Sequence, residues 1–276
     1  MKSKILTAAV LLFAIAASGN KLFAQASKTP AAGKDEVIVV GLEGAYPPYN
    51  FIEKDGTVSG YDADVIRAID ERTDGFAFHF EPTAWDAIFV ALESGKFDII
   101  ANQISKNKAR EEKYLFSESP YLYGYGAIIF KKGRTDIKTI ADLEGKTVAA
   151  GVGSYNTSWL ENYNATHSNK VKIQYYDGNV ALMFADVASG RVDATLNDPI
   201  TTGLFIKNQN LPLDYALRTD RDATPVYLLF SRNEKGARDK KLVDKALASL
   251  IADGSLSKIS VKWFGKDFTT NKAAAK

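Results

Sequence analysis

The segment from Gly151 to Trp159, GVGSYNTSW, places two glycines directly before a predicted helix. Such a turn leaves the backbone N–H groups of Ser154, Tyr155 and Asn156 free at the start of the helix, where the helix dipole favours an anion such as a carboxylate. A nucleotide site is not indicated, because a Walker motif needs Gly-Lys-Ser/Thr after the glycines and a dinucleotide fingerprint needs a third glycine. An ordinary helix capped by Ser154 is an equally good interpretation.

Two charged residues have ordinary structural explanations when each is taken alone. Arg110 lies in the segment ISKNKAREEKYLFS, which is predicted to be a charged loop, and exposed arginine–glutamate pairs are common and weak there. Asp198 directly precedes Pro199, an order typical of the residue that caps a helix N-terminus. Neither residue identifies a ligand site by itself.

Metal and nucleophile sites are poorly supported. The chain has no cysteine, and its two histidines, His79 and His167, lie far apart in the sequence. No common set of metal ligands and no nucleophile–histidine arrangement can therefore be assembled. We expect no metal, no cofactor and no catalytic residue.

Segments typical of strands alternate with amphipathic segments typical of helices along residues 36–265. This order predicts α/β units on mainly parallel sheets, in which ligands bind beyond the carboxyl ends of the strands. The Pro-rich segment GAYPPYNF (44–51) is predicted to be a loop. Four predicted strands run into polar or glycine-rich loops: EGAY after Leu42, NQIS after Ala101, GVGSYN after Ala150 and ND after Leu196. We predict the ligand site where these four loops meet.

Two ten-residue segments, SGKFDIIANQ from Ser94 and SGRVDATLND from Ser189, resemble each other. Each ends an amphipathic helical run at Ser-Gly and continues into a short apolar strand that ends in polar residues. Two similar α/β lobes in one chain would produce this repetition, and so would convergence of helix-to-strand turns.

The N-terminal 26 residues predict a cleavable secretory signal peptide. Lys2 and Lys4 precede an apolar run too short to span a membrane, and the sequence AQA follows it. Residues 27–35 predict a flexible leader. Without the signal peptide's three lysines the chain has 32 basic and 33 acidic residues, which disfavours nucleic acid as a partner. An exported chain without cysteine has no disulfide and no cysteine-linked lipid, so we expect a periplasmic location.

Six ordered blocks resemble the periplasmic polar-amino-acid-binding proteins of ABC importers, solute-binding protein family 3: GYDADVIRAI, AWDAIFVALESGKFDIIANQIS, AREEKYLFSESPYL, DLEGKTVAAGVGS, SGRVDATLND and ADGSLSKISVKWFG. The resemblance covers nearly all of residues 36–268. It implies a type II-like, two-lobed periplasmic binding protein fold, in which two α/β lobes joined by two crossover hinge strands close on a ligand. Lobe 1 would comprise residues 36–122 and 223–268, lobe 2 residues 123–222, and the tail residues 269–276.

The resemblance also implies a role for each matching residue. The ligand α-carboxylate would be bound by Arg110, with Ser105, Ser154 and Tyr155. The ligand ammonium would be bound by Asp198 and Gln103, and the ligand side chain by Tyr46, Trp85, Glu43, Asn156 and Asn197. The family pattern T-x-T-x-E-R is here SKNKAR, in which Asn107 and Ala109 replace threonine and glutamate, so the positioning of this loop departs from the pattern.

The blocks are most similar to the L-cystine-binding branch, so the resemblance implies a monomeric receptor that delivers L-cystine to an ABC permease in the inner membrane. The segment GVGSYN departs from the loop expected in that branch. Cyclic-acid dehydratases of the cyclohexadienyl dehydratase kind share the fold and are the alternative; such an enzyme needs a general acid, for which Glu43 is the candidate. A receptor sensor domain is disfavoured, because no spanning helix follows Gly265.

Overall fold

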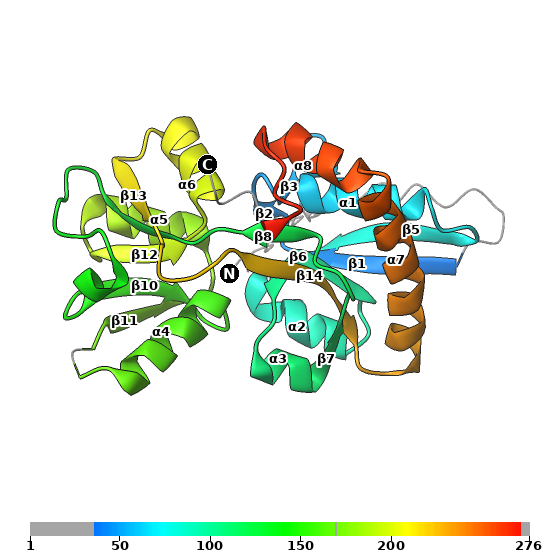
Figure 1. Cartoon of the computed structure of the whole chain (residues 1–276), viewed down its shortest axis with the longest axis horizontal. Helices are drawn as coiled ribbons and strands as arrows, with labels where there is room; N and C mark the ends of the chain where they lie inside the picture. The colour runs from blue at the N-terminus through cyan, green and yellow to red at the C-terminus, as the bar shows by residue number, and fades with distance from the viewer. Residues whose placement is uncertain (1–35, 169, 272–276) are drawn as a thin grey trace, which may run out of the picture. The chain divides into compact units, whose positions relative to one another are not determined.

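The computed structural model describes residues 36–168 and 170–271, which belong to one compact unit (Figure 1). The predicted signal peptide (1–26), the leader (27–35) and residues 272–276 of the predicted tail lie outside the described residues. Within the described part, no helix is long and apolar enough to cross a membrane.

The first sheet has six strands and is assembled from both ends of the described chain. The strands β5, β1 and β6 are mutually parallel, and β14 runs antiparallel to β6. Two short strands, β7 and β8, pair with β14. In spatial order the sheet consists of β5 (Phe76–Pro82), β1 (Glu36–Leu42), β6 (Ile99–Ser105), β14 (Thr224–Ser231) and β7 (Tyr114–Phe116), with β8 (Leu122–Gly124) beside β14.

The second sheet repeats this arrangement with strands from the middle of the chain. Again three strands are parallel, and the fourth runs antiparallel to the third. The order is β11 (Lys172–Tyr176), β10 (Thr147–Gly151), β12 (Ala194–Asn197), β9 (Ala127–Lys131) and β13 (Leu213–Leu217). The repeated sequence segments form β6 and β12, which occupy the same position in their sheets. The fold is thus a two-lobed α/β binding-protein fold.

The chain passes between the sheets twice, first between Gly124 and Ala127 and then between Leu217 and Thr224 (Figure 1). The lobe boundaries proposed from the sequence, at residues 122/123 and 222/223, fall beside these crossings. Because β8 still pairs with β14, the first crossing begins two residues after the proposed boundary.

Helices pack on both sheets. Their ends follow local rules, for example Asn179 capping α5 at its start and Gly190 ending it in a left-handed conformation. On the first sheet lie α1 (Tyr61–Asp70), α2 (Trp85–Glu93), α3 (Lys108–Lys113), α7 (Glu234–Ala252) and α8 (Ser255–Phe264), and with the second sheet lie α4 (Tyr155–Thr166), α5 (Val180–Ser189), α6 (Pro199–Gln209) and a 3₁₀ turn (Ile140–Leu143).

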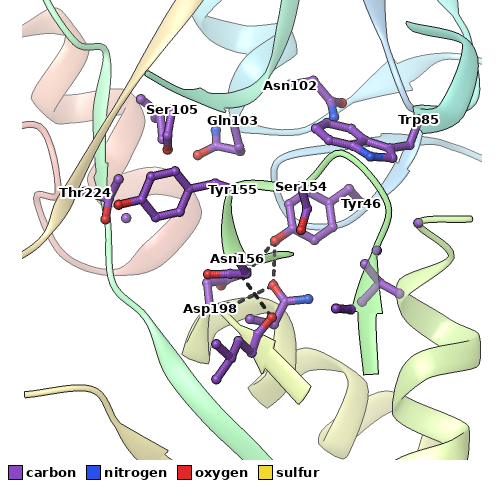
Figure 2. A pocket seen from close by; sticks show the side chains of 18 of the residues that line it. Tyr46, Trp85, Asn102, Gln103, Ser105, Ser154, Tyr155, Asn156, Asp198 and Thr224 are labelled. Atoms are coloured by element: carbon purple, nitrogen blue, oxygen red, sulfur yellow. Dashed lines mark hydrogen bonds between the residues drawn. The ribbon is translucent and has the colours of Figure 1, made fainter. Parts of the chain in front are cut away.

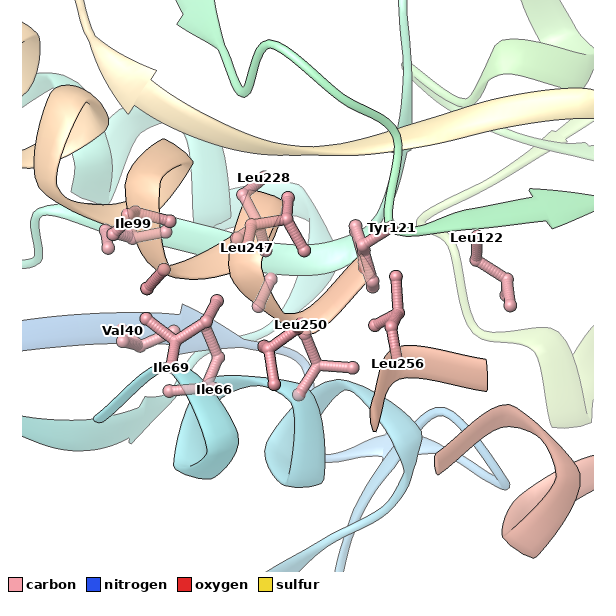
Figure 3. Packing of buried hydrophobic residues seen from close by; sticks show 14 of the residues in the cluster. Val40, Ile66, Ile69, Ile99, Tyr121, Leu122, Leu228, Leu247, Leu250 and Leu256 are labelled. Carbon is pink, nitrogen blue, oxygen red and sulfur yellow. The ribbon is translucent and has the colours of Figure 1, made fainter. Parts of the chain in front are cut away.

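The core of the first lobe joins sequence-distant segments. Ile66 of α1 packs in one buried cluster with Ile99 of β6 and with Leu247 and Leu250 of α7 (Figure 3). In the second lobe, alternate residues of each strand enter clusters on opposite faces, as Ile128 and Ile129 of β9 show. Each lobe therefore has its own apolar core, and the first depends on both ends of the described chain.

The structure corrects two local predictions. The segment predicted as a Pro-rich loop contains part of a small antiparallel sheet of β2 (Ala45–Tyr46), β3 (Asn50–Ile52) and β4 (Val58–Ser59). Its prolines, Pro47 and Pro48, lie in the turn between β2 and β3, where no ladder N–H is required. The predicted charged loop around Arg110 is in part the helix α3, which Asn107 caps.

Candidate ligand-binding site

A cavity of about 180 Å³ is lined by residues of both lobes (Figure 2). All four predicted loop segments contribute to its wall. The prediction that NQIS (102–105) is a loop was wrong, because these residues form the last part of β6, and Asn197 likewise ends β12. The eleven residues to which the sequence assigned a ligand role all line this cavity: Glu43, Tyr46, Trp85, Gln103, Ser105, Arg110, Ser154, Tyr155, Asn156, Asn197 and Asp198.

Arg110 is buried, with 6% of its surface exposed. Its Nη1 donates to the carbonyl oxygen of Ser105 at 2.9 Å, and its Nη2 donates to the carbonyl oxygen of Gly153, in the other lobe, at 2.9 Å. Its guanidinium also lies over the rings of Phe89 and Trp85, at 5.0 and 5.8 Å from their centroids. Burial lowers the pKa of Arg110 to about 10.

The surface ion pair expected for Arg110 from its sequence context is therefore wrong. No ion pair within residues 36–168 and 170–271 includes Arg110. A buried cation that is hydrogen-bonded only to backbone carbonyls keeps its charge available to an anion in the cavity.

Asp198 caps α6, as the sequence context predicts, and also lines the cavity. Its Oδ1 accepts from the N–H groups of Ile200 and Thr201 at 2.9 and 2.8 Å. The same oxygen accepts from the Tyr49 hydroxyl at 3.0 Å, and Oδ2 accepts from the Tyr46 hydroxyl at 2.7 Å. These donors hold the carboxylate rigidly at the cavity wall.

The Tyr46 hydroxyl lies within hydrogen-bond distance of two acceptors, Oδ2 of Asp198 and Oδ1 of Asn197, the latter at 2.8 Å. One hydroxyl proton cannot serve both oxygens fully. Burial, followed by the charge of Asp198, raises the pKa of Tyr46 well above its ordinary value. The phenol therefore stays neutral and remains a donor.

The N-terminus of α4 is less open than the sequence suggested. Ser154 Oγ accepts from the Thr157 N–H at 3.1 Å, and the Ser154 N–H donates to the Gly151 carbonyl at 3.0 Å. The Ser154 amide is therefore occupied, and the prediction that it is free was wrong. Tyr155 and Asn156 supply the remaining amides of this turn, and Asn156 Nδ2 donates to the Leu196 carbonyl at 3.0 Å.

Gln103 has a left-handed backbone conformation, with φ of 55°, which is uncommon for a residue other than glycine. Its Nε2 donates to Oδ1 of Asp62 at 2.6 Å, so its own amide oxygen is the group that it can offer to a ligand cation. Local strain of this kind often accompanies binding sites. Ser105 is also buried at the cavity, with 6% of its surface exposed.

Trp85 connects the lobes. Its indole Nε1 donates to the Val152 carbonyl at 2.9 Å, and its ring lies against Gly178. A Cβ on Gly178 would come within 2.5 Å of the Trp85 ring. The indole fits here because residue 178 has no side chain.

Glu43 lies on the same wall as Asn102, whose Oδ1 accepts from the Glu43 N–H at 2.8 Å. Burial raises the pKa of Glu43, and a hydrogen bond with Asn102 partly opposes this rise. Glu43 is thus a carboxyl group held partly away from water inside the cavity.

The sequence assigned no ligand role to five lining residues with polar side chains, which are Tyr49, Asn102, Tyr125, Arg221 and Thr224. Asn102 lies within the polar NQIS segment, so its position at the ligand site could have been predicted from the sequence. Tyr125 and Arg221 lie on the two crossings between the sheets, where no helical or strand periodicity marks them. Within the described parts of the chain, no three His, Cys, Asp or Glu side chains are grouped so that they could hold a metal ion.

A two-lobed α/β fold with a cavity at the strand ends of both sheets is the architecture of extracytoplasmic solute-binding proteins, and comparison with known proteins agrees. The chain belongs to family 3 of the bacterial extracellular solute-binding proteins, whose model matches residues 38–266. The L-cystine-binding protein TcyA of Bacillus subtilis is 36% identical over 237 residues, which cover 85% of this chain and 83% of TcyA.

Solved structures give the same result. One similar structure comes from a study of glutathione import via GshT and the cystine ABC importer TcyBC of Streptococcus mutans. It matches with a TM-score of 0.77 and 29% identity, over 85% of this chain and 97% of that chain. An ancestral arginine-binding protein bound to arginine matches with a TM-score of 0.74 and 29% identity, over 84% of this chain and all of that chain (100%).

Proposed function

We propose that this protein is a periplasmic receptor that binds a zwitterionic L-amino acid and delivers it to an ABC permease. One observation carries the proposal. On one lobe the cavity has a buried arginine, Arg110, that forms no ion pair with any described residue, and on the other lobe it has a fixed carboxylate, Asp198. Arg110 binds the α-carboxylate and Asp198 the α-ammonium. Ser105 and the first-turn amides of α4 add donors to the carboxylate, and the oxygen of Gln103 adds an acceptor to the ammonium.

L-cystine is the ligand that we favour. The name of TcyA supports this choice, and so do the polar groups of Glu43, Asn156 and Asn197 that line the cavity beyond the first head group. The aromatic rings of Tyr46 and Trp85 suit polarisable sulfur atoms between two head groups. Because a similar structure contains arginine, other amino acids are the direct competitors.

Isothermal titration under non-reducing conditions tests both levels of the proposal. The purified mature protein is unfolded and refolded to remove any retained ligand, and is then titrated with L-cystine, glutamine, arginine, histidine and glutamate. We expect L-cystine to bind tightest. Binding of another amino acid at least tenfold tighter would overturn the cystine assignment, and binding of none would overturn the receptor.

The dehydratase alternative rests on Glu43, whose raised pKa is what a general acid needs. The carboxyl group nevertheless lies in a cavity whose charges match an amino acid. Incubation with cyclohexadienyl acids, followed by chromatographic detection of aromatic products, separates the two functions. A receptor returns its ligand unchanged, whereas turnover that is lost in Glu43→Gln would establish the enzyme.

A further inference from the structure

Arg221 is a second arginine in the cavity wall. It lies on the second crossing between the sheets, and its guanidinium is 5.2 Å from the ring centroid of Tyr155. Its Nε and Nη1 are buried and have no hydrogen-bond partner among residues 36–168 and 170–271. The nearby carboxylate of Asp220 forms its ion pair with Arg218 instead. Burial and the charge of Arg218 lower the pKa of Arg221, and Tyr155 and Asp220 oppose this only in part. Arg221 therefore brings to this wall a positive charge that its described neighbours compensate incompletely.

The surroundings of Arg221 hold the guanidinium in place and supply further polar groups. A Cβ on Gly126 would come within 2.6 Å of Arg221 Nη2, so this first-crossing glycine makes room for the guanidinium. Tyr125, also on the first crossing, lines the cavity, and its buried hydroxyl has no partner in the described part of the chain. Figure 2 shows the Tyr155 phenol pointing toward Thr224, on the side of the cavity away from Trp85.

Unpartnered donors of this kind favour a ligand that supplies charge-bearing acceptors. A buried guanidinium and a phenol without acceptors are costly in the empty site. A carboxylate compensates both, because it accepts from the guanidinium and from the hydroxyl at once. Neutral or cationic ligand ends would leave Arg221 unpaired.

The charges of the lining residues match two head groups rather than one. The charged residues of the cavity wall are two arginines, Arg110 and Arg221, and two acids, Asp198 and Glu43. A single amino-acid head group pairs with Arg110 and Asp198 and leaves one cation and one carboxylate over. A ligand with a second carboxylate and a second ammonium uses all four residues.

We infer that Arg221, with Glu43, forms a second head-group subsite, and that the ligands of this protein are diamino dicarboxylic acids. This inference rests on the proposed receptor function and narrows its substrate class. Arg221 binds the distal carboxylate with help from the Tyr125 hydroxyl, and Glu43 binds the distal ammonium. The disulfide of cystine is then a spacer, so thioether or hydrocarbon spacers of similar length are also accepted.

The decisive probe is S-(methylthio)-L-cysteine, which keeps the disulfide and one head group of L-cystine but lacks the other. By titration calorimetry, wild-type protein should bind L-cystine at least tenfold tighter than this probe and should also bind L-cystathionine. Arg221→Gln should weaken L-cystine binding at least tenfold and leave binding of the probe within threefold of wild type. The ratio of the affinities for L-cystine and the probe should therefore fall. Arg221→Lys should retain part of the discrimination, because the charge remains.

The matched control is Arg134→Gln, which removes one positive charge from the ion pairs with Asp136 and Asp193, outside the cavity wall. It should change neither the affinity for L-cystine nor the affinity for S-(methylthio)-L-cysteine. Equal binding of L-cystine and the probe by wild-type protein would overturn the second subsite even if Arg221→Gln does not fold. Tight binding of amino acids with a single head group, unaffected by Arg221→Gln, would also overturn the second subsite, but it would leave the proposed receptor function intact. Failure of every amino acid to bind would instead contradict the proposed function.

Discussion

The Tyr46 hydroxyl lies 2.7 Å from Oδ2 of Asp198, although the two residues are 152 positions apart and belong to different lobes. Tyr46 ends β2 of the small sheet, and Asp198 caps α6. Together with the Trp85–Val152 and Arg110–Gly153 hydrogen bonds, this contact joins the lobes across the cavity. Residues to which we propose a ligand role therefore also join the two lobes.

Tyr46→Phe removes this cross-lobe donor and keeps the ring. A hydrogen bond to a charged acceptor contributes about 1.5–3 kcal/mol, so we expect ligand affinity to fall about 10- to 150-fold. Titration calorimetry measures the change. The control is Tyr163→Phe, which deletes a hydroxyl bound to Glu144 at 2.8 Å within the second lobe and should leave affinity unchanged. An unaltered affinity for Tyr46→Phe would show that the contact does not contribute to the bound state.

Removing the charge of Arg110 or of Asp198, which we propose bind the two ends of the first head group, should weaken ligand binding strongly. Arg110→Ala leaves the ligand carboxylate buried without its partner, and we expect a loss of about 3–5 kcal/mol in binding free energy. Asp198→Asn is the better partner variant, because asparagine still caps α6 and the fold is retained. It should weaken binding to a similar extent, with thermal stability close to that of wild type. Binding within threefold of wild type would remove the substituted residue from the ligand contacts.

Asp62 should make stability depend on pH. Its side chain is fully buried and accepts from Asn50, Gln103 and Tyr121, and burial raises its pKa to about 7. In the unfolded chain an aspartate has a pKa of about 3.9. The folded state therefore holds the proton more tightly, and the stability that this proton gives is complete below about pH 4. It is lost at about 1.4 kcal/mol per pH unit as the pH rises to about 7.

Urea unfolding at pH 5, 6, 7 and 8 measures this dependence. Asp62→Asn, which cannot titrate, should remove the decline between pH 5 and 7 and leave the remaining pH dependence unchanged. A decline of equal slope in the variant would show that another group is responsible. The same substitution tests whether Asp62 positions the side chain of Gln103, because the Gln103 amide donates a hydrogen bond to Asp62.

The sequence predicts the location of the site better than its individual contacts. The polar residues Glu43, Asn102, Ser154 and Asn197 lie at or near the carboxyl ends of buried strands, and parallel strands bring these ends to one edge. The burial of Arg110 could not be predicted, because it depends on Phe89 and Trp85, which reach it only through the tertiary fold.

Arg221 and Tyr125 were missed for a related reason. Each lies on a crossing between the sheets, where the path of the chain rather than any periodic pattern determines what a side chain contacts. The small sheet at residues 45–59 was missed because its strands have only two or three residues each.

Gly178 tests the role of Trp85 in closure. Gly178 has φ of 99°, and a Cβ there would lie 2.5 Å from Trp85 Cδ1. Gly178→Ala should therefore displace the indole from the second lobe and weaken ligand binding at least tenfold. It should also cost about 1 kcal/mol of folding stability, because alanine is strained at positive φ.

The matched control for this prediction is Gly133→Ala. Gly133 has a similar φ of 90°, but a Cβ there would meet no atom within 4 Å. This variant should show the backbone cost in thermal unfolding without any change in affinity. Comparison of the two variants by calorimetry separates backbone strain from the collision with Trp85. Equal affinities would mean that the indole can leave Gly178 without loss of binding, and that lobe closure depends on the Tyr46 and Arg110 contacts instead.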